Sequence, residues 1–299
     1  MKARRPLVVV ADDFGIGPET TRGILDLAAE GRISATVLLV NSPHAESAVA
    51  AWNRIHRPVE VGWHPCLTLD RPILPADRVP SLVDADGSFP SLGGFIRRVC
   101  TGRIRAGEVA AELGAQYVRF RDLVGHEPRV VNTHQHVALF SPVGRVLHEL
   151  LANQCPRPFV RRVVEPARTI TQVPGARLKR SVLSILGRWA ARRTAGFGFP
   201  GCAVLAGVTD PPHVADEQFF IRWLGAVQGS SVELMVHPGY RDESLIGRDC
   251  IADNECIARR VHELNLLRAA DFSAAALRAG FRLTAPAELS DGGRHASAA

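Results

Sequence analysis

Short apolar segments alternate with amphipathic segments along most of this chain, and this alternation is the feature that most constrains its fold. Each apolar segment has the length and β-branched content of a buried strand, and each amphipathic segment has helical spacing. Strands that alternate with helices form parallel sheets. With 299 residues, of which 46% are hydrophobic, the chain is long enough for one large α/β domain.

The apolar segments that we predict to be strands are 7–11, 33–40, 59–64, 129–136, 158–164, 231–237 and 281–284. The predicted helices are 19–30, 43–54, 106–124, 142–152, 179–193, 215–224, 251–267 and 272–279. Residues 70–94 are rich in proline and are predicted to form a loop. We predict one domain over 1–289, with an irregular insertion or lid at 165–210, and a disordered tail at 290–299.

The composition narrows the class of protein. The formal net charge is +6, but the arginines that supply it are mostly scattered, so we expect no nucleic-acid partner. The six cysteines form no C-x-x-C pair, which indicates reduced thiols and a cytoplasmic location. The N-terminal residues lack the pattern of a signal peptide, and no run of about 18 apolar residues predicts a transmembrane helix.

Acidic and histidine side chains end four of the predicted strands. They are Asp12 and Asp13, His64, His134 and His136, and His237. Because the carboxyl ends of parallel strands meet at one edge of a sheet, we expect these side chains to converge. An unpaired buried charge is costly, so a buried strand that ends on two carboxylates indicates a site that binds charge.

One carboxylate and two imidazoles form a common ligand set for a catalytic divalent metal, and Asp13, His64 and His134 could supply it. Adjacent residues of a strand point to opposite faces, so Asp12 and Asp13 can have different roles. Asp12 would be free to act as a general base and His237 as an acid. The alternative is that the two aspartates cap the following helix and that the histidines are unrelated.

The same segments give the chain its resemblance to the YdjC family of carbohydrate deacetylases, also called the ChbG/HpnK family. The matching residues are A-D-D-F-G at 11–15, S-A-T-V-L-L-V-N at 34–41, V-G-W-H at 61–64, L-V-D-A-D-G-S-F at 82–89, N-T-H-Q-H at 132–136, V-R at 160–161 and E-L-M-V-H-P-G-Y at 233–240. The match runs in order from about residue 7 to residue 285, which makes it more specific than a single motif.

The resemblance implies an α/β fold of one domain, an irregular (β/α) barrel similar to the polysaccharide deacetylase (NodB-like) barrel. It implies a carbohydrate N-deacetylase that uses Mg²⁺ or Zn²⁺ and acts on an N-acetylglucosamine-type sugar, either an oligosaccharide or a glycolipid. Residue by residue, it places the metal on Asp13, His64 and His134. It places the base on Asp12, the acid on His237 and an arginine that pairs with the base on Arg161. A homodimer is also consistent with it.

The chain departs from the family pattern at two positions. Many members read D-S-H-x-H-x-H where this chain has N-T-H-Q-H-V-A at 132–138. Asn132 replaces an aspartate and Ala138 replaces the last histidine, whereas the expected ligand His134 is retained. We therefore expect the departures to affect the surroundings of the metal and the choice of substrate.

Several further residues have simpler explanations. His136 would be a fourth ligand if it shared a strand face with His134, but we favour a hydrogen-bonded neighbour. Trp63 fits a sugar-stacking position and a core position equally well. For Arg259, Arg260 and Glu263, which have salt-bridge spacing on a predicted helix, we favour a structural role.

The predicted helix at 179–193 has apolar residues on one side and arginines on the other. It could lie on an anionic or membrane surface and serve a lipid-linked substrate, but we favour a lid helix packed on the rim of the barrel. Two other functions stay open: a metal-dependent hydrolase of a non-sugar amide or ester, and a non-catalytic protein that binds sugar or lipid.

Overall fold

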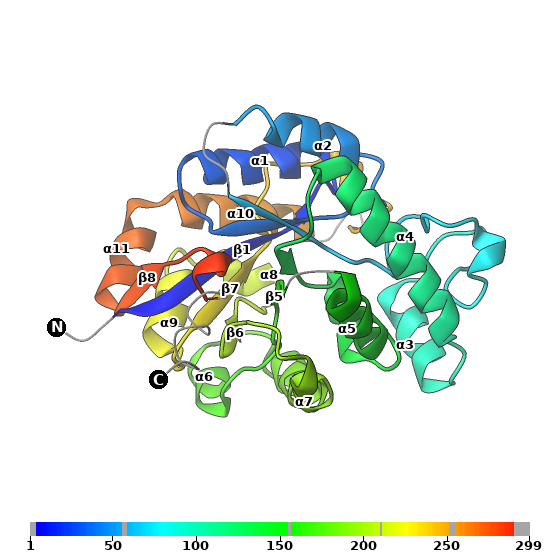
Figure 1. Ribbon diagram of the computed structural model, residues 1–299. Helices are drawn as coiled ribbons and strands as arrows, with labels where there is room; N and C mark the ends of the chain where they lie inside the picture. The colour runs from blue at the N-terminus through cyan, green and yellow to red at the C-terminus, as the bar shows by residue number, and fades with distance from the viewer. Residues whose placement is uncertain (1–3, 56–58, 155–156, 210, 251–254, 290–299) are drawn as a thin grey trace.

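The computed structural model describes residues 4–55, 59–154, 157–209, 211–250 and 255–289. In these residues eight strands form one parallel sheet, with the order β5-β4-β3-β2-β1-β7-β6 and with β8 paired to the start of β1 (Figure 1). The strands are β1 Arg5–Phe14, β2 Ala35–Leu38, β3 Glu60–Trp63, β4 Val130–Val131, β5 Phe159–Val160, β6 Val204–Ala206, β7 Val232–Val236 and β8 Phe281–Leu283.

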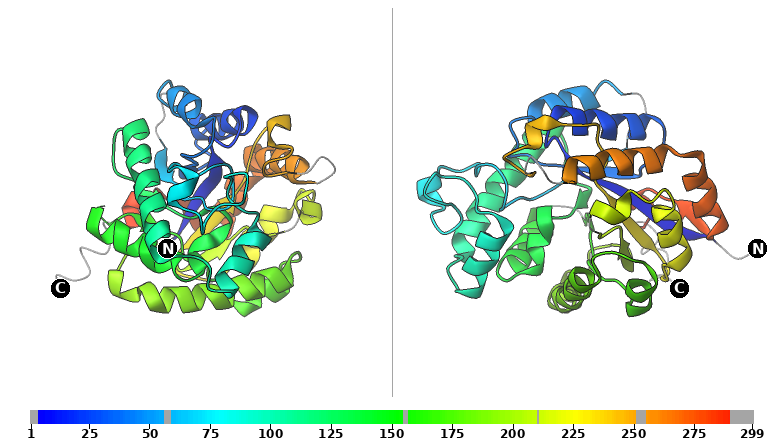
Figure 2. Two further views of the ribbon diagram at one scale, coloured as in Figure 1. Left: turned by 90° about the vertical axis from the view of Figure 1, so that its right-hand side faces the viewer. Right: turned by 180° about the vertical axis from the view of Figure 1, so that it is seen from behind.

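Helices surround this sheet, as the two further views in Figure 2 show. The α-helices are α1 Pro18–Ala29, α2 Ala45–Trp52, α3 Leu92–Cys100, α4 Ala106–Val124, α5 Val143–Gln154, α6 Ala167–Gln172, α7 Arg177–Thr194, α8 Pro211–Val214, α9 Phe219–Ala226, α10 Cys256–Arg268 and α11 Ala270–Arg278. Short 3₁₀ segments are η1 Ala76–Arg78, η2 His134–Leu139, η3 Ala195–Phe197 and η4 Glu243–Leu245.

The sheet is curled, and its two edges are joined by isolated backbone hydrogen bonds rather than by a ladder. The Val160 N–H donates to the Pro200 carbonyl at 2.8 Å, and the Leu205 N–H donates to the Val164 carbonyl at 2.9 Å. These bonds connect β5 and the residues that follow it to β6 and the segment that leads into β6. The predicted α/β fold of one domain, an irregular barrel, is confirmed.

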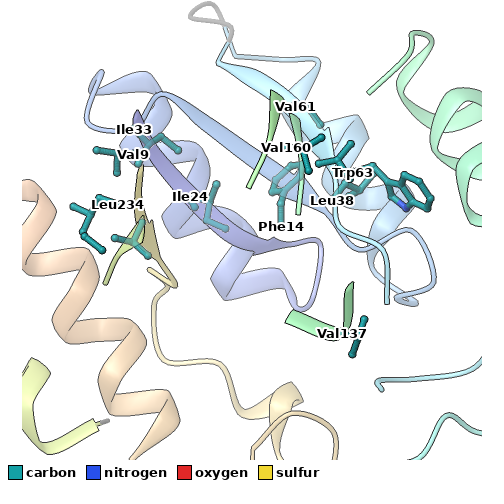
Figure 3. Packing of buried hydrophobic residues seen from close by; sticks show 14 of the residues in the cluster. Val9, Phe14, Ile24, Ile33, Leu38, Val61, Trp63, Val137, Val160 and Leu234 are labelled. Atoms are coloured by element: carbon teal, nitrogen blue, oxygen red, sulfur yellow. The ribbon is translucent and has the colours of Figure 1, made fainter. Parts of the chain in front are cut away.

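The core lies between β1 and the elements that cover it. Figure 3 shows Val9 of β1 beside Leu234 of β7 and the α1 residue Ile24, all buried in one cluster. Trp63 also belongs to this cluster. Its side chain is 0% exposed, and its ring packs edge-on against the ring of Tyr117, with 5.9 Å between the ring centroids. Of the two predicted positions for Trp63, the core position is therefore correct and sugar stacking is excluded.

The long elements agree with the sequence patterns, and the short ones do not. Helix α4 has the predicted bounds and ends at Gly125, whose φ of 82° is the left-handed conformation that glycine adopts without strain. The strand predicted over 129–136 is wrong beyond Val131, because η2 begins at His134. Neither β6 nor α3 was predicted, since neither is long enough to show a clear period.

One more predicted helix differs from the structure at its start, and two predicted segments lie partly or wholly outside the described residues. The helix predicted at 215–224 begins at Phe219 instead, as α9. The first residues of the helix predicted at 251–267 and the tail predicted at 290–299 lie outside the described residues. Within the described part of the chain, none of the helices combines the length and the apolar character that crossing a membrane requires.

Candidate active site

The polar side chains that end four predicted strands lie around one cavity at the carboxyl edge of the sheet. The cavity has a volume of about 290 Å³. The strand-end side chains that line it are Asp12, Asp13, His64, His134, His136 and His237. They follow or end β1, β3, β4 and β7, whose carboxyl ends meet because the strands are parallel. The structure therefore brings together the residues that the sequence predicted to converge.

Strand β1 does not end as a regular strand. Asp13 has a φ of 65°, and the register with β2 shifts between Ala11 and Phe14. A regular strand would turn Asp12 and Asp13 to opposite faces, as predicted, but this irregularity allows both side chains to line the same cavity. A left-handed non-glycine residue costs of order 1–3 kcal/mol, and such residues cluster at functional sites.

Asp13, His64 and His134 form a compact group of possible metal ligands. One donor atom from each of the three lies within 4.8 Å of the others, and all three side chains are buried. The Asp13 Oδ1 atom is 3.3 Å from His64 Nε2 and 3.1 Å from His134 Nδ1. One carboxylate and two imidazoles at this separation suit a divalent ion such as Zn²⁺.

The surroundings of these three side chains also fit a metal site. His64 Nδ1 is 2.9 Å from the Asn132 carbonyl, a contact that orients the ring and directs Nε2 to Asp13. His134 Nε2 is buried and has no hydrogen-bond partner among the described residues. Arg260 donates to Asp13 Oδ2 at 2.7 Å, which leaves Oδ1 for the histidines. Burial alone would raise the pKa of Asp13, but Arg260 and the imidazoles lower it well below the usual range.

Asp12 has a different set of partners. Its two oxygens accept from the Arg161 guanidinium at 2.6 and 2.8 Å, a bidentate pair. Asn132 Nδ2 donates to Asp12 Oδ1 at 3.2 Å. Arg161 in turn donates through Nε to Glu233 of β7 at 2.6 Å. Arg161 therefore pairs with Asp12, as expected, and is held in place by a second buried carboxylate.

These contacts set the protonation state of Asp12. Burial would raise the pKa of this carboxyl, but Arg161 outweighs burial and lowers the pKa to about 2. For Glu233 the balance is reversed, and burial raises its pKa despite the same arginine. Asp12 is therefore ionised at every pH at which the protein would be assayed.

His237 lies on the Asp12 side of the cavity. Its Nε2 atom is 3.9 Å from Asp12 Oδ2, and Arg259 donates to its Nδ1 at 3.3 Å. Glu263 accepts hydrogen bonds from the backbone N–H of His237 and from Arg259 Nε, the second at 2.7 Å. Burial, followed by the nearby Arg259, lowers the pKa of His237 to about 4. The imidazole is therefore neutral in the free protein at neutral pH.

His136 does not extend the metal-binding group. It has a φ of 57° within η2, so the strand geometry that would have placed it beside His134 is absent. Within the described residues, the group of possible ligands holds Asp13, His64 and His134 without His136. Burial and Arg161 lower the pKa of His136 to about 3, so it faces the cavity as a neutral ring.

Comparison with known proteins identifies the family. The family model described as YdjC-like protein matches residues 6–278. The chain belongs to the YdjC-like family. Among its relatives, the chitooligosaccharide deacetylase of Klebsiella pneumoniae (strain 342) is 32% identical over 93% of this chain and 97% of its own. The carbohydrate deacetylase of Mus musculus is 30% identical over 95% of this chain and 94% of its own.

A solved structure shows the same fold. It is a candidate cellobiose-phosphate cleavage protein from Enterococcus faecalis V583, 21% identical in sequence, with a TM-score of 0.74. The likeness covers 96% of this chain and 99% of that one. At this identity the likeness concerns the fold alone.

The structure gives a reason for the asparagine at position 132 of this YdjC-like protein. Its amide donates to Asp12 Oδ1 at 3.2 Å, whereas an ionised aspartate would place another negative charge beside Asp12. Ala138 lies in η2 and takes part in a neighbouring cavity rather than in the group of possible ligands. Both departures therefore affect the surroundings of the site and leave the possible ligands in place.

Five residues that hold the site were assigned no role in it from the sequence: Glu233, Asp249, Arg259, Arg260 and Glu263. Arg260 donates to Asp13, and it also donates to Asp249 Oδ2 at 2.8 Å. Its spacing on the predicted helix had indicated only a salt bridge within that helix. The pair with that spacing is Arg259–Glu263. Glu233 could have been found from the sequence, because a carboxylate within the apolar run 232–236 is expected to be buried and must then have a charged or hydrogen-bonding partner. Asp249 carried no local signal.

Proposed function

We propose that this protein is a metal-dependent hydrolase that removes the N-acetyl group from an N-acetylglucosamine-type sugar. The observation that carries the proposal is the group of Asp13, His64 and His134, placed beside an ion-paired Asp12 in one cavity. The deacetylase names of the full-length relatives support the reaction class. The cavity volume of about 290 Å³ suits part of a sugar chain rather than a large polymer segment.

Asp13 Oδ1, His64 Nε2 and a ring nitrogen of His134 would hold a divalent ion, Zn²⁺ or Mg²⁺. Such an ion polarises an acyl oxygen and lowers the pKa of a bound water. Arg260 neutralises part of the Asp13 charge and keeps one of its oxygens away from the ligand group.

Asp12 is proposed as the general base. Its orientation is fixed by two hydrogen bonds from Arg161, so it cannot turn to become another ligand without breaking a buried ion pair. Its low pKa keeps it ionised and able to accept a proton, although it holds that proton weakly. The accepted proton must therefore pass on quickly.

His237 is proposed as the acid that protonates the leaving nitrogen. Since its pKa is about 4 in the free protein, it must gain the proton during the reaction rather than bring it. Asp12 is 3.9 Å from His237 Nε2 and is the group from which the proton would come. Accepting it at Nε2 requires the tautomer with hydrogen on Nδ1, so the 3.3 Å contact from Arg259 must open in that state.

The deciding experiment measures acetate release from N-acetylglucosamine, chito-oligosaccharides of increasing length and a lipid-linked N-acetylglucosaminide. Each is assayed with added Zn²⁺, with Mg²⁺ and with chelator, and bound metal is quantified in parallel. Release from at least one substrate that stops with chelator supports the proposal. Bound metal without release would favour a hydrolase of another amide or ester, and neither metal nor release would favour a binding protein.

A further inference from the structure

Helix α7 presents an apolar stripe to solvent. Leu178, Val182, Ile185 and Trp189 are 80%, 47%, 47% and 54% exposed. Their spacing of four, three and four residues places them on one face of the helix, one above the other. Large apolar side chains exposed singly are common, but four in a row along an outer helix indicate a surface that contacts something.

The opposite face of α7 is already anchored to the protein. Arg180 is buried, pairs with Glu165 and donates to the Val173 carbonyl at 2.7 Å. One turn further, the Ser184 hydroxyl donates to the Glu165 carbonyl at 2.8 Å. Gly187 follows, and a Cβ atom there would lie only 1.7 Å from the Val163 carbonyl oxygen, so the helix packs closely on the chain. The packed face of α7 is therefore the one opposite the apolar stripe, and the stripe is left exposed to solvent.

All the charged residues of α7 are cationic. The helix contains Arg177, Lys179, Arg180, Arg188, Arg192 and Arg193 and no acidic residue. Its six cations equal the formal net charge of +6 of the whole chain, so the rest of the chain is formally neutral. Apart from Arg180, these residues are exposed. Arg177, Arg188 and Arg193 each also donate one hydrogen bond to a backbone carbonyl, those of Thr171, Glu165 and Leu139.

We propose that α7 docks this protein on an anionic phospholipid surface. A helix with an apolar stripe flanked by arginine and lysine lies in the plane of a bilayer, with the stripe between the acyl chains and the cations among the headgroups. No described helix can cross a membrane, so α7 lies on the surface rather than spanning it. A second copy of the chain fits less well, since two α7 helices face to face would bring their cations together and α7 itself contains no acidic residue.

Docking through α7 would place the candidate active site next to the lipid surface. Lys179 and Leu183 of α7 line the active-site cavity, and Gly187 and Ala190 line a second cavity of about 360 Å³ beside it. Figure 2 shows α7 extending along one outer side of the molecule, so its stripe is not covered by another helix. One helix diameter, about 10 Å, would separate the bilayer surface from the cavity wall.

The test uses the full chain and vesicles of phosphatidylcholine with or without about 30% phosphatidylglycerol. We expect sedimentation with the anionic vesicles only, weakened by salt. The tryptophan fluorescence should shift to shorter wavelength on binding, mainly through Trp189, since Trp63 and Trp223 are buried and Trp52 of α2 is partly buried. Absence of binding to anionic vesicles at low salt would overturn the proposal.

Two pairs of variants separate the apolar and cationic contributions. Ile185→Ser with Trp189→Ser removes half of the stripe, and the matched control is Val118→Ser with Leu277→Ser, two similarly exposed apolar residues on α4 and α11. We expect at least a tenfold loss of vesicle binding from the α7 pair and little from the control. Equal losses would overturn the proposal, as would a dimer that only the α7 pair abolishes.

The second pair is Arg188→Gln with Arg192→Gln, which should weaken binding to anionic vesicles about thirtyfold. Its matched control, Arg103→Gln with Arg278→Gln, removes two exposed charges away from α7 and should change binding little. None of these residues contacts the group of possible ligands, so soluble-substrate activity should be unchanged in all four variants. An effect of the same size from both charge pairs would contradict docking through α7.

Discussion

Asp12 and Asp13 are adjacent in the sequence and line the same cavity, but they have almost no partners in common. Asp12 is held by Arg161 and Asn132, and Asp13 by Arg260 and the two histidines at positions 64 and 134. Each carboxylate has its own arginine, which explains how two neighbouring charges are both buried and both ionised. Under the function proposed above, these partners, rather than the residue type, would assign Asp13 to a metal and Asp12 to proton transfer.

The largest effect is expected from Asp13→Asn. This change removes the charged member of the ligand group, so the protein should lose its bound metal and nearly all acetate release. We expect a loss larger than the about 10²–10⁴-fold that removal of a general base causes. Metal content measured by mass spectrometry, beside the activity, tests this. Retained metal with full activity would assign the ligand role to another group.

Asp12→Asn should separate the two carboxylates. The variant keeps the possible ligands, so metal content should stay at the wild-type level, whereas turnover should fall by about 10²–10⁴-fold. Circular dichroism serves as the folding control. Near-normal turnover would remove Asp12 from the mechanism, and loss of metal would show that the two carboxylates do not have separate roles.

Arg161→Met should destabilise the protein by about 3–5 kcal/mol, because it leaves Asp12 buried without its main partner. The matched control is Arg282→Met, which breaks an ion pair with Glu288 in which both side chains are about half exposed. We expect no more than about 1 kcal/mol from the control. Urea unfolding of both variants gives the comparison, and equal costs would show that the Asp12–Arg161 pair is not buried as described.

Arg260→Met tests the other carboxylate in the same way, and its stability should depend on metal. Without metal, Asp13 loses its cationic partner and the cost should approach that of Arg161→Met. With Zn²⁺ bound, the ion would compensate the Asp13 charge and restore part of the stability. No such recovery is expected for Arg161→Met. Equal recovery in both variants would argue against separate partners.

Much of this arrangement could be predicted from the sequence, because the patterns that identify it are local. The apolar run of β1 is followed at once by the two aspartates, and α4 shows its period over 19 residues. The parallel alternation then required His64 and His237 to meet them at one edge. The long helix α4 and the polar side chains at the ends of β1, β3 and β7 could therefore be located without any knowledge of packing.

The remainder depended on contacts distant in sequence or on irregular backbone. Arg260 meets Asp13 across 247 positions, and no spacing predicts such a pair. The left-handed residues Asp13, Gln135 and His136 break the strand alternation on which the predicted side-chain directions depended. Strands as short as β4 and β5 are set by their neighbours in the sheet, so their own residues predicted them too long.

The last prediction concerns His237, which belongs to the Asp12 side and has the smallest expected effect. Its pKa is about 4 in the folded protein and about 6.5 when unfolded. The unfolded chain therefore binds more protons between these values, and stability falls as the pH falls from about 6.5 to 4. His237→Gln should remove up to about 3 kcal/mol of this loss, measured without metal by urea unfolding at pH 7 and pH 4.5.

The pH dependence of stability also shows how much of the lowered pKa of His237 is due to Arg259. Burial and Arg161 lower the pKa of His136 to about 3. His136 therefore also lowers the stability of the protein as the pH falls, and His237→Gln leaves this contribution unchanged. In Arg259→Gln, the imidazole of His237 loses the neighbouring cation, and its pKa should rise toward 6.5. The variant should then lose less stability on acidification than the wild type. If both variants show the wild-type slope, neither burial nor Arg259 lowers the pKa of His237, and its imidazole can bring its own proton to the reaction.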